Sequence, residues 1–150
     1  MEFHNSARAD AADVARYLVE KTANGMAQLK LQKLLYYCQA ASLAWTKRRM
    51  FSQRIEAWIN GPVVVEFWES HRYEGWIQSV PDGKPLPNST ARQIVDKVFE
   101  RYQYLTPAEL VDLTHREPPW QNARKTFGPS ERATVKITAE AMLDYYVEHW

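Results

Sequence analysis

A helical period of apolar residues between positions 31 and 45 is the feature that most constrains the fold of this chain. The positions that carry the period are Leu31, Leu34, Leu35, Cys38, Ala41, Ser42 and Trp45. Their spacing of three and four residues continues over several turns, which is typical of an amphipathic helix. The basic run of Lys47, Arg48 and Arg49 follows, where positive charge suits the C-terminal end of a helix. We therefore expect one long helix that ends near residue 47.

Most of the remaining chain also shows helical patterns. Apolar spacing, proline positions and capping residues predict six further helices. They are expected over about 9–22, from Pro62 to about His71, over 94–102, from Pro107 to about His115, over one or two turns from Pro118, and over 138–149. Residues 54–60 instead alternate apolar and polar side chains, as in a short strand. The predicted fold class is therefore mainly α: a compact single-domain helical bundle of about six or seven helices, with a minor β element near residues 54–60, spanning residues 1–150.

The segment from Gly75 to Asn88 interrupts the helical patterns. It holds Pro81, Asp82-Gly83, Pro85 and Pro87, a density of proline and glycine that predicts a loop. The segment is the best candidate in the chain for a lid, or for a stretch that a partner orders.

Charge and hydropathy limit the partners and the location of the protein. With 19 basic and 18 acidic side chains the net charge is +1, which disfavours a nucleic acid held by bulk charge. Lys30 and Lys33 begin the long helix, and we interpret them as part of a solvated helix end rather than a nucleic-acid surface. The polar N-terminus does not fit a secretory signal, and no apolar stretch reaches the ~20 residues that span a bilayer. These patterns predict a cytoplasmic protein without a membrane partner.

No motif for catalysis, cofactor binding or metal binding emerges from the sequence. The histidines, at positions 4, 71, 115 and 149, lack the spacing that places two metal ligands on one helix face. Cys38, the only cysteine, lies on the apolar stripe and is predicted to be a buried, inactive thiol. No nucleophile elbow is present, and the five glycines are too scattered for a phosphate-binding loop. We therefore expect no catalytic, cofactor-binding or metal-binding residues, and no enzymatic activity.

Three short motifs nevertheless look specified. In chain order they are Leu31-Gln32-Lys33-Leu34-Leu35-Tyr36-Tyr37, then Glu56-Ala57-Trp58 with Gly61-Pro62-Val63-Val64, and then Thr114-His115 with Pro119-Trp120. Their order and spacing resemble the Panacea domain family, which contains SocA-like antitoxins and phage-associated proteins. The resemblance covers about residues 10–146, which we take as the core of the domain.

This resemblance implies a function without catalysis. It implies an antitoxin of a bacterial or prophage toxin–antitoxin system, which neutralises a cognate protein toxin by direct protein–protein interaction. The SocA branch of the family instead acts as a proteolytic adaptor that delivers its toxin to a Clp-type protease, and this is the alternative. A DNA-binding autoregulator is a less favoured alternative. The resemblance carries over no catalytic residue and no cofactor, and it leaves open the identity of the toxin and the formation of a homo-oligomer.

We expect exposed aromatic residues to anchor the toxin interface and basic residues to pair with acidic groups of the toxin. The candidate anchors are Tyr73, Trp76 and Trp120, and the candidate basic residues are Arg48, Arg49 and Arg72. The motif residues are assigned to the scaffold, namely Leu31, Lys33, Leu34, Tyr36, Tyr37, Glu56, Trp58, Gly61, Pro62, His115 and Trp120. Trp120 thus belongs to both sets.

Overall fold

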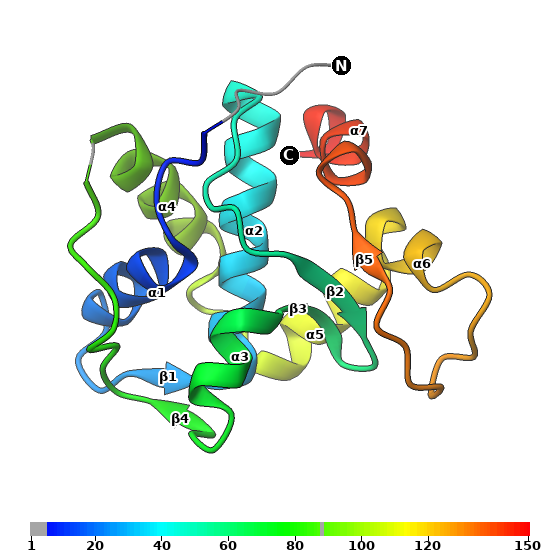
Figure 1. Cartoon of the computed structure of the whole chain (residues 1–150), viewed down its shortest axis with the longest axis horizontal. Coiled ribbons are helices and arrows are strands. Elements are labelled where there is room, and N and C mark those ends of the chain that lie inside the picture. Colours follow the sequence, from blue (N-terminus) through cyan, green and yellow to red (C-terminus); the bar gives the residue numbers. More distant parts are fainter. Residues whose placement is uncertain (1–5, 88) are drawn as a thin grey trace.

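One long central helix is surrounded by the other elements in the computed structural model, which describes residues 6–87 and 89–150 (Figure 1). The described residues form seven helices and five short strands: α1 (Ala11–Glu20), β1 (Met26–Ala27), α2 (Gln28–Thr46), β2 (Ile55–Trp58), β3 (Gly61–Val64), α3 (Val65–His71), β4 (Trp76–Ile77), α4 (Ser89–Tyr102), α5 (Pro107–His115), α6 (Pro118–Ala123), β5 (Lys136–Ile137) and α7 (Ala139–His149). The strands form a sheet in the order β3-β2-β5 and a separate pair β1-β4, all antiparallel. The protein is therefore mainly α with a small sheet, as predicted, but not purely α.

Two parts of the sequence-based predictions cannot be followed in this structure. The N-terminal stretch that does not fit a secretory signal includes residues 1–5, which lie outside the described residues together with His4. Asn88, the last residue of the predicted loop, lies outside them as well.

The central helix is α2, which packs against α1, α4, α5 and α7 (Figure 1). The helix predicted over 31–45 is thus confirmed, and it begins earlier, at Gln28. Because β3 and four helices cover α2, it is buried on almost all sides rather than along one stripe. Cys38 is fully buried as predicted, and burial raises the pKa of its thiol. Lys33 is fully buried too, so its interpretation as part of a solvated helix end is wrong.

Several helix ends follow from local sequence. Glu109 N donates a hydrogen bond to Thr106 Oγ1 at 3.1 Å, and Thr106 N donates to Glu109 Oε1 at 2.9 Å, so the two residues form a capping box at the start of α5. Thr138 accepts a hydrogen bond from Ala141 N at 3.1 Å and starts α7 in the same way. At the other end of α2, Lys47 ends the helix in the left-handed conformation, with φ 56°. These contacts confirm the helices predicted from Pro107 and from 138.

The β2-β3 hairpin corrects one prediction. Pro62, expected to open a helix, lies in β3 opposite Ala57, and α3 begins only at Val65. The N–H of Ala57 donates to Val135 O at 2.8 Å, on the side facing β5. The Ala57–Pro62 pair therefore exchanges no ladder hydrogen bond, and the N–H that proline lacks is not needed there. β3 is also an edge strand, where a sheet tolerates proline.

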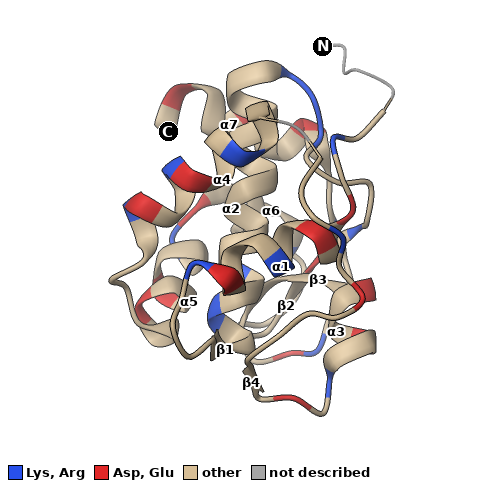
Figure 2. Cartoon of the chain, turned by 90° about the vertical axis from the view of Figure 1, so that its left-hand side faces the viewer, with Lys and Arg blue, Asp and Glu red and all other residues tan. Residues whose placement is uncertain are grey.

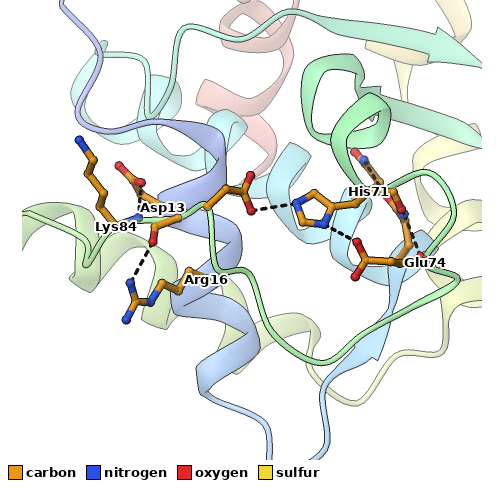
Figure 3. A network of polar contacts seen from close by, with 9 residues as sticks. Asp13, Arg16, His71, Glu74 and Lys84 are labelled. Carbon is orange, nitrogen blue, oxygen red and sulfur yellow. Dashed lines mark hydrogen bonds and ion pairs between the residues drawn. The ribbon is translucent and has the colours of Figure 1, made fainter.

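The predicted loop begins with β4 and continues as residues 78–87, called the strap below. Two hydrogen bonds fix the strap on α1: Lys84 N donates to Asp13 Oδ1 at 2.8 Å, and Arg16 Nη1 donates to Gly83 O at 2.9 Å (Figure 3). Apolar side chains of the strap are buried as well, including Val80 and Leu86. The described part of the loop is therefore packed on the core, and its role as a lid stays a prediction.

A histidine holds the strap from the other side. His71, at the end of α3, is 6% exposed and lies between two carboxylates. Its Nδ1 is 2.8 Å from Glu74 Oε2, and its Nε2 is 3.0 Å from Asp82 Oδ1 in the strap (Figure 3). The strap thus links α1 to α3, and it fixes the position of the residues that follow α3.

Candidate protein-binding surface

The first two motifs meet where α2 crosses the outer edge of β3. Lys33 Nζ donates a hydrogen bond to Pro62 O at 3.0 Å, and Val64 N donates to Gln32 Oε1 at 2.8 Å. These backbone groups of β3 point away from β2, and in a larger sheet a fourth strand would satisfy them. Side chains of the central helix satisfy them instead, which explains why α2 carries an amide and an amine at buried positions.

The side chain of Lys33 packs directly against the backbone of Gly61 at this edge. Gly61 has φ +108°, a conformation that favours glycine, and a Cβ there would lie 2.6 Å from Lys33 Cε and 2.9 Å from Thr114 Oγ1. The amine of Lys33 is fully buried, and burial lowers its pKa to about 7. Gly61 is therefore needed both for the backbone conformation and for the close approach of α2 and α5 to β3.

The first and third motifs meet at the half-buried carboxylate of Glu117. Glu117 Oε1 accepts hydrogen bonds from the hydroxyls of Tyr37, at 2.6 Å, and Tyr146, at 2.8 Å. The Tyr146 hydroxyl also lies 3.0 Å from that of Tyr36. Burial raises the pKa of Glu117, although the two hydroxyls oppose this effect. The network ties α2 and α7 to the start of α6.

The second and third motifs meet at two tryptophans. Trp120 Nε1 donates to Trp58 O at 2.8 Å, and the Trp120 ring stacks on His115 with centroids 3.9 Å apart. Burial lowers the pKa of His115, whose Nε2 is buried without a hydrogen-bond partner among the described residues. Trp120 is only 8% exposed, so its indole serves the scaffold and is not available as an exposed anchor. We call the three meeting points together the motif junction.

Two residues of the motif junction were missing from the predicted scaffold set. Arg124 is buried, its Nη1 donates to Ala57 O at 2.8 Å, and its guanidinium lies 5.3 Å from the ring centre of Trp120. No local pattern marks Arg124, because its partners lie far away in the sequence. Glu117 is different: it lies within the third motif, directly before two prolines. That position is a signal that could have identified it.

A groove of about 540 Å³ opens beside the motif junction. Trp58 and Trp68 form one wall, with ring centres 5.1 Å apart and ring planes at 73°. Trp58 Nε1 donates to Glu56 Oε1 at 2.8 Å, which fixes the orientation of the indole. The other lining residues come from the start of α2, the β2-β3 turn and β3, the segment that follows α3 and the segment before β5, and they include Leu29, Val63, Arg72, Glu74 and Arg132.

An exposed aromatic corner borders the groove. It consists of Arg72 and Tyr73, which follow α3, and of Trp76, the first residue of β4. Tyr73 is 89% exposed and Trp76 is 57% exposed. The guanidinium of Arg72 lies 5.0 Å from the ring centre of Tyr73 and 6.0 Å from that of Trp68. Arg72 and Tyr73 therefore lie together beside the groove, whereas the Trp76 indole donates to Asn24 O at 2.8 Å and lines a separate pocket with Lys30 and Tyr104.

The other two predicted basic residues lie elsewhere. Arg48 follows the C-terminal end of α2, about 28 Å along the helix from its start (19 residues at ~1.5 Å each). Its Nε donates to Ser6 O at 3.0 Å, which ties it to the N-terminal segment. Arg49 lines a separate pocket with Ile55 and Lys136. Arg48 and Arg49 therefore do not belong to the aromatic corner.

Basic residues do not gather at the start of α2. Lys33 is buried, and Lys30 Nζ donates to Gln103 O at 2.5 Å. On the face shown in Figure 2, acidic and basic residues are interspersed over α1, α3 and α4. This distribution agrees with the net charge of +1.

Metal binding and membrane insertion find no support in the part of the chain that the structure describes. There, no three His, Cys, Asp or Glu side chains gather in a way that could hold a metal ion. Among the same residues, no helix has both the length and the apolar character needed to cross a bilayer.

The fold and its site define a small, mainly helical domain in which a buried motif junction supports an exposed aromatic corner and a groove. The family model described as "Antitoxin SocA-like, Panacea domain" matches residues 31–121, from α2 to α6, and includes all three motifs. This match spans more than half of the chain, and the protein therefore belongs to the SocA-like Panacea domain family. Comparisons with curated proteins and with solved structures gave no match. Family membership points to an antitoxin-type, non-enzymatic role with a protein partner.

Proposed function

We propose that this protein is an antitoxin that neutralises a protein toxin by binding it directly through the aromatic corner. The observation that carries the proposal is the match to the SocA-like antitoxin family. The surface supports it, because exposed aromatic side chains beside a guanidinium group are typical anchors of protein interfaces. Binding at this corner occludes the active site of the toxin or holds the toxin in an inactive shape.

Co-expression with the product of the neighbouring gene tests this proposal. The neighbouring protein alone should arrest growth, and the wild-type chain should restore it. A double variant, Tyr73→Ala with Trp76→Ala, should fail to restore growth, because it removes the two exposed aromatic anchors. Trp45→Ala is the matched control: it removes an indole that is 40% exposed near the far end of α2. A neighbour that is harmless alone, or that stays toxic beside the wild-type chain, contradicts the proposal.

The same strains separate direct binding from the alternatives. If binding alone neutralises the toxin, the amount of toxin stays constant and the two proteins purify together. A proteolytic adaptor would instead cause the toxin to disappear, and only in strains that contain the Clp-type protease. Operator binding that weakens steeply with salt would identify a DNA-binding autoregulator.

A further inference from the structure

The groove beside the aromatic corner carries two guanidinium groups from different segments. Arg72 follows α3, and Arg132 lies in the segment before β5. Neither forms an ion pair with a carboxylate within the described part of the chain. The contacts of Arg72 with the rings of Tyr73 and Trp68 leave its charge uncompensated and hold it at the groove.

Three polar side chains of the groove, Glu74, Gln28 and Gln32, form contacts within the chain, while Asn60 lines the groove as an exposed amide. Glu74 is the one carboxylate among the described lining residues, and its Oε2 lies 2.8 Å from His71 Nδ1. Gln28 Nε2 donates to the carbonyl oxygens of His71, at 2.8 Å, and Glu74, at 3.0 Å. Gln32 accepts from Val64 N. The charged groups of the groove without an ion-pair partner among the described residues are therefore the two guanidiniums, with Asn60 as a neutral polar neighbour.

Apolar surface lies next to these cations. The Trp58–Trp68 pair forms a wall, and both rings are half-buried. Leu29, also half-buried, lines the same groove. A volume of about 540 Å³ is within the range of ~300–1,000 Å³ typical of ligand sites. The groove can therefore receive an apolar side chain and place neighbouring carboxylates near the two guanidiniums.

We propose that the groove binds an acidic segment of the protein partner, with carboxylates paired to Arg72 and Arg132 and an apolar side chain against Trp58 and Trp68. Charge complementarity is the reason for this choice of occupant, because two unpaired cations beside an aromatic wall select carboxylates over amides. The identity of the partner rests on the proposed function, whereas the chemistry of the bound segment rests on the groove alone.

A peptide-binding assay on the full chain tests the groove without a toxin. The probe is a short fluorescein-labelled peptide in which Asp and Glu residues flank a central Trp-Leu pair. Arg72→Gln and Arg132→Gln should each weaken its binding about three-fold, and together about ten-fold. Lys97→Gln, which removes one exposed positive charge from α4, should leave the binding constant unchanged. Thermal unfolding of each variant checks that its fold is intact.

Changes in the peptide give a second test that leaves the protein untouched. An amide twin, with Asn and Gln in place of Asp and Glu, should bind about ten-fold more weakly. A twin with Ser-Ser in place of Trp-Leu should also lose affinity. Failure of the acidic peptide to bind, equal binding of the amide twin, or unchanged binding by either arginine variant would overturn the proposal. Displacement of the peptide by an equal concentration of ATP would overturn it too, because it would identify a phosphate site.

The toxin assay then distinguishes the two proposals. If Arg132→Gln binds peptide and neutralises toxin like the wild type while Tyr73→Ala fails to neutralise, the groove inference is wrong and the antitoxin function stands. If the wild-type chain fails to neutralise the neighbour while the peptide results hold, the antitoxin proposal is wrong. The groove then remains a site for acidic segments.

Discussion

The motif junction and the aromatic corner use the same kinds of residue for opposite purposes. In the junction, Arg124 and Trp120 are buried, and Arg124 Nη1 and Trp120 Nε1 each donate to a backbone oxygen of β2. At the groove and the corner, Arg72 has no carboxylate partner among the described residues, and Tyr73 is 89% exposed. Residue type alone therefore does not separate scaffold from binding surface. What separates them is burial, because Arg124 and Trp120 are covered in the folded chain whereas Arg72 and Tyr73 are exposed.

The largest expected effect concerns Gly61. Gly61→Ala should lower the free energy of unfolding by about 3 kcal/mol or prevent folding, because it combines a positive φ with a clash against Lys33 and Thr114. Urea unfolding of the purified chain measures this change. Gly75→Ala is the matched control, since a Cβ there meets no atom within 4 Å, and it should stay within ~0.5 kcal/mol of wild type. If Gly61→Ala and Gly75→Ala were equally stable, β3 and the Lys33 side chain would be able to shift and accommodate the added methyl group.

A somewhat smaller loss is expected at Glu117. Glu117→Ala leaves the hydroxyls of Tyr37 and Tyr146 without their acceptor and should cost about 2 kcal/mol in urea unfolding. Glu148→Ala, which removes an exposed carboxylate from α7, is the control and should change stability by less than ~0.5 kcal/mol. If both variants unfold at the same urea concentration, the carboxylate does not hold α2, α6 and α7 together.

Lys33 predicts a pH dependence. Its pKa is about 7 in the folded chain against 10.5 as the reference value, so between these values the unfolded chain binds a proton that the folded chain does not. The contribution of Lys33 to stability therefore rises with pH, by up to ~1.4 kcal/mol per pH unit, and is least favourable below pH 7. Lys33→Met should flatten this slope in unfolding experiments from pH 7 to pH 9, whereas Lys97→Met should keep it. A Lys33→Met variant with the wild-type slope would show that the amine stays charged when buried.

The smallest effects on stability are expected at the binding surface. Tyr73→Ala and Arg72→Gln should each change the free energy of unfolding by less than ~0.5 kcal/mol, because both side chains are exposed. Their effects should appear in toxin neutralisation and in peptide binding instead. If Tyr73→Ala or Arg72→Gln lowered the free energy of unfolding as much as Glu117→Ala does, these side chains would belong to the scaffold rather than to a binding surface.

Local sequence patterns were enough to predict most helices. The apolar period of α2, the burial of Cys38 and the capping box of Thr106 and Glu109 depend on neighbours within a few residues, and the structure confirms them. The alternation near residues 54–60 likewise predicted β2. The pairs β1-β4 and β2-β5 escaped prediction, because two-residue strands have no period and form only through partners distant in sequence.

The candidate site was predicted less well than the fold. Tyr73 and Trp76 were recognised as exposed aromatics, but nothing local distinguishes them from Trp120, which is covered only in the folded chain. Lys33 was misjudged for a related reason: a lysine in a helix is usually solvated, and its acceptor, Pro62 O, belongs to β3, which sequence patterns placed in a helix. Contacts between distant segments decided all of these outcomes.

The closed edge of β3 has a consequence for how this protein can assemble. Pro62 lacks the outward N–H that an incoming chain would need, while Lys33 and Gln32 occupy the outward groups at Pro62 O and Val64 N. Edge-to-edge polymerisation, and augmentation of the sheet by a foreign strand, are therefore blocked on this side. Any chain that docks at this edge must therefore be held by side-chain contacts rather than by strand pairing.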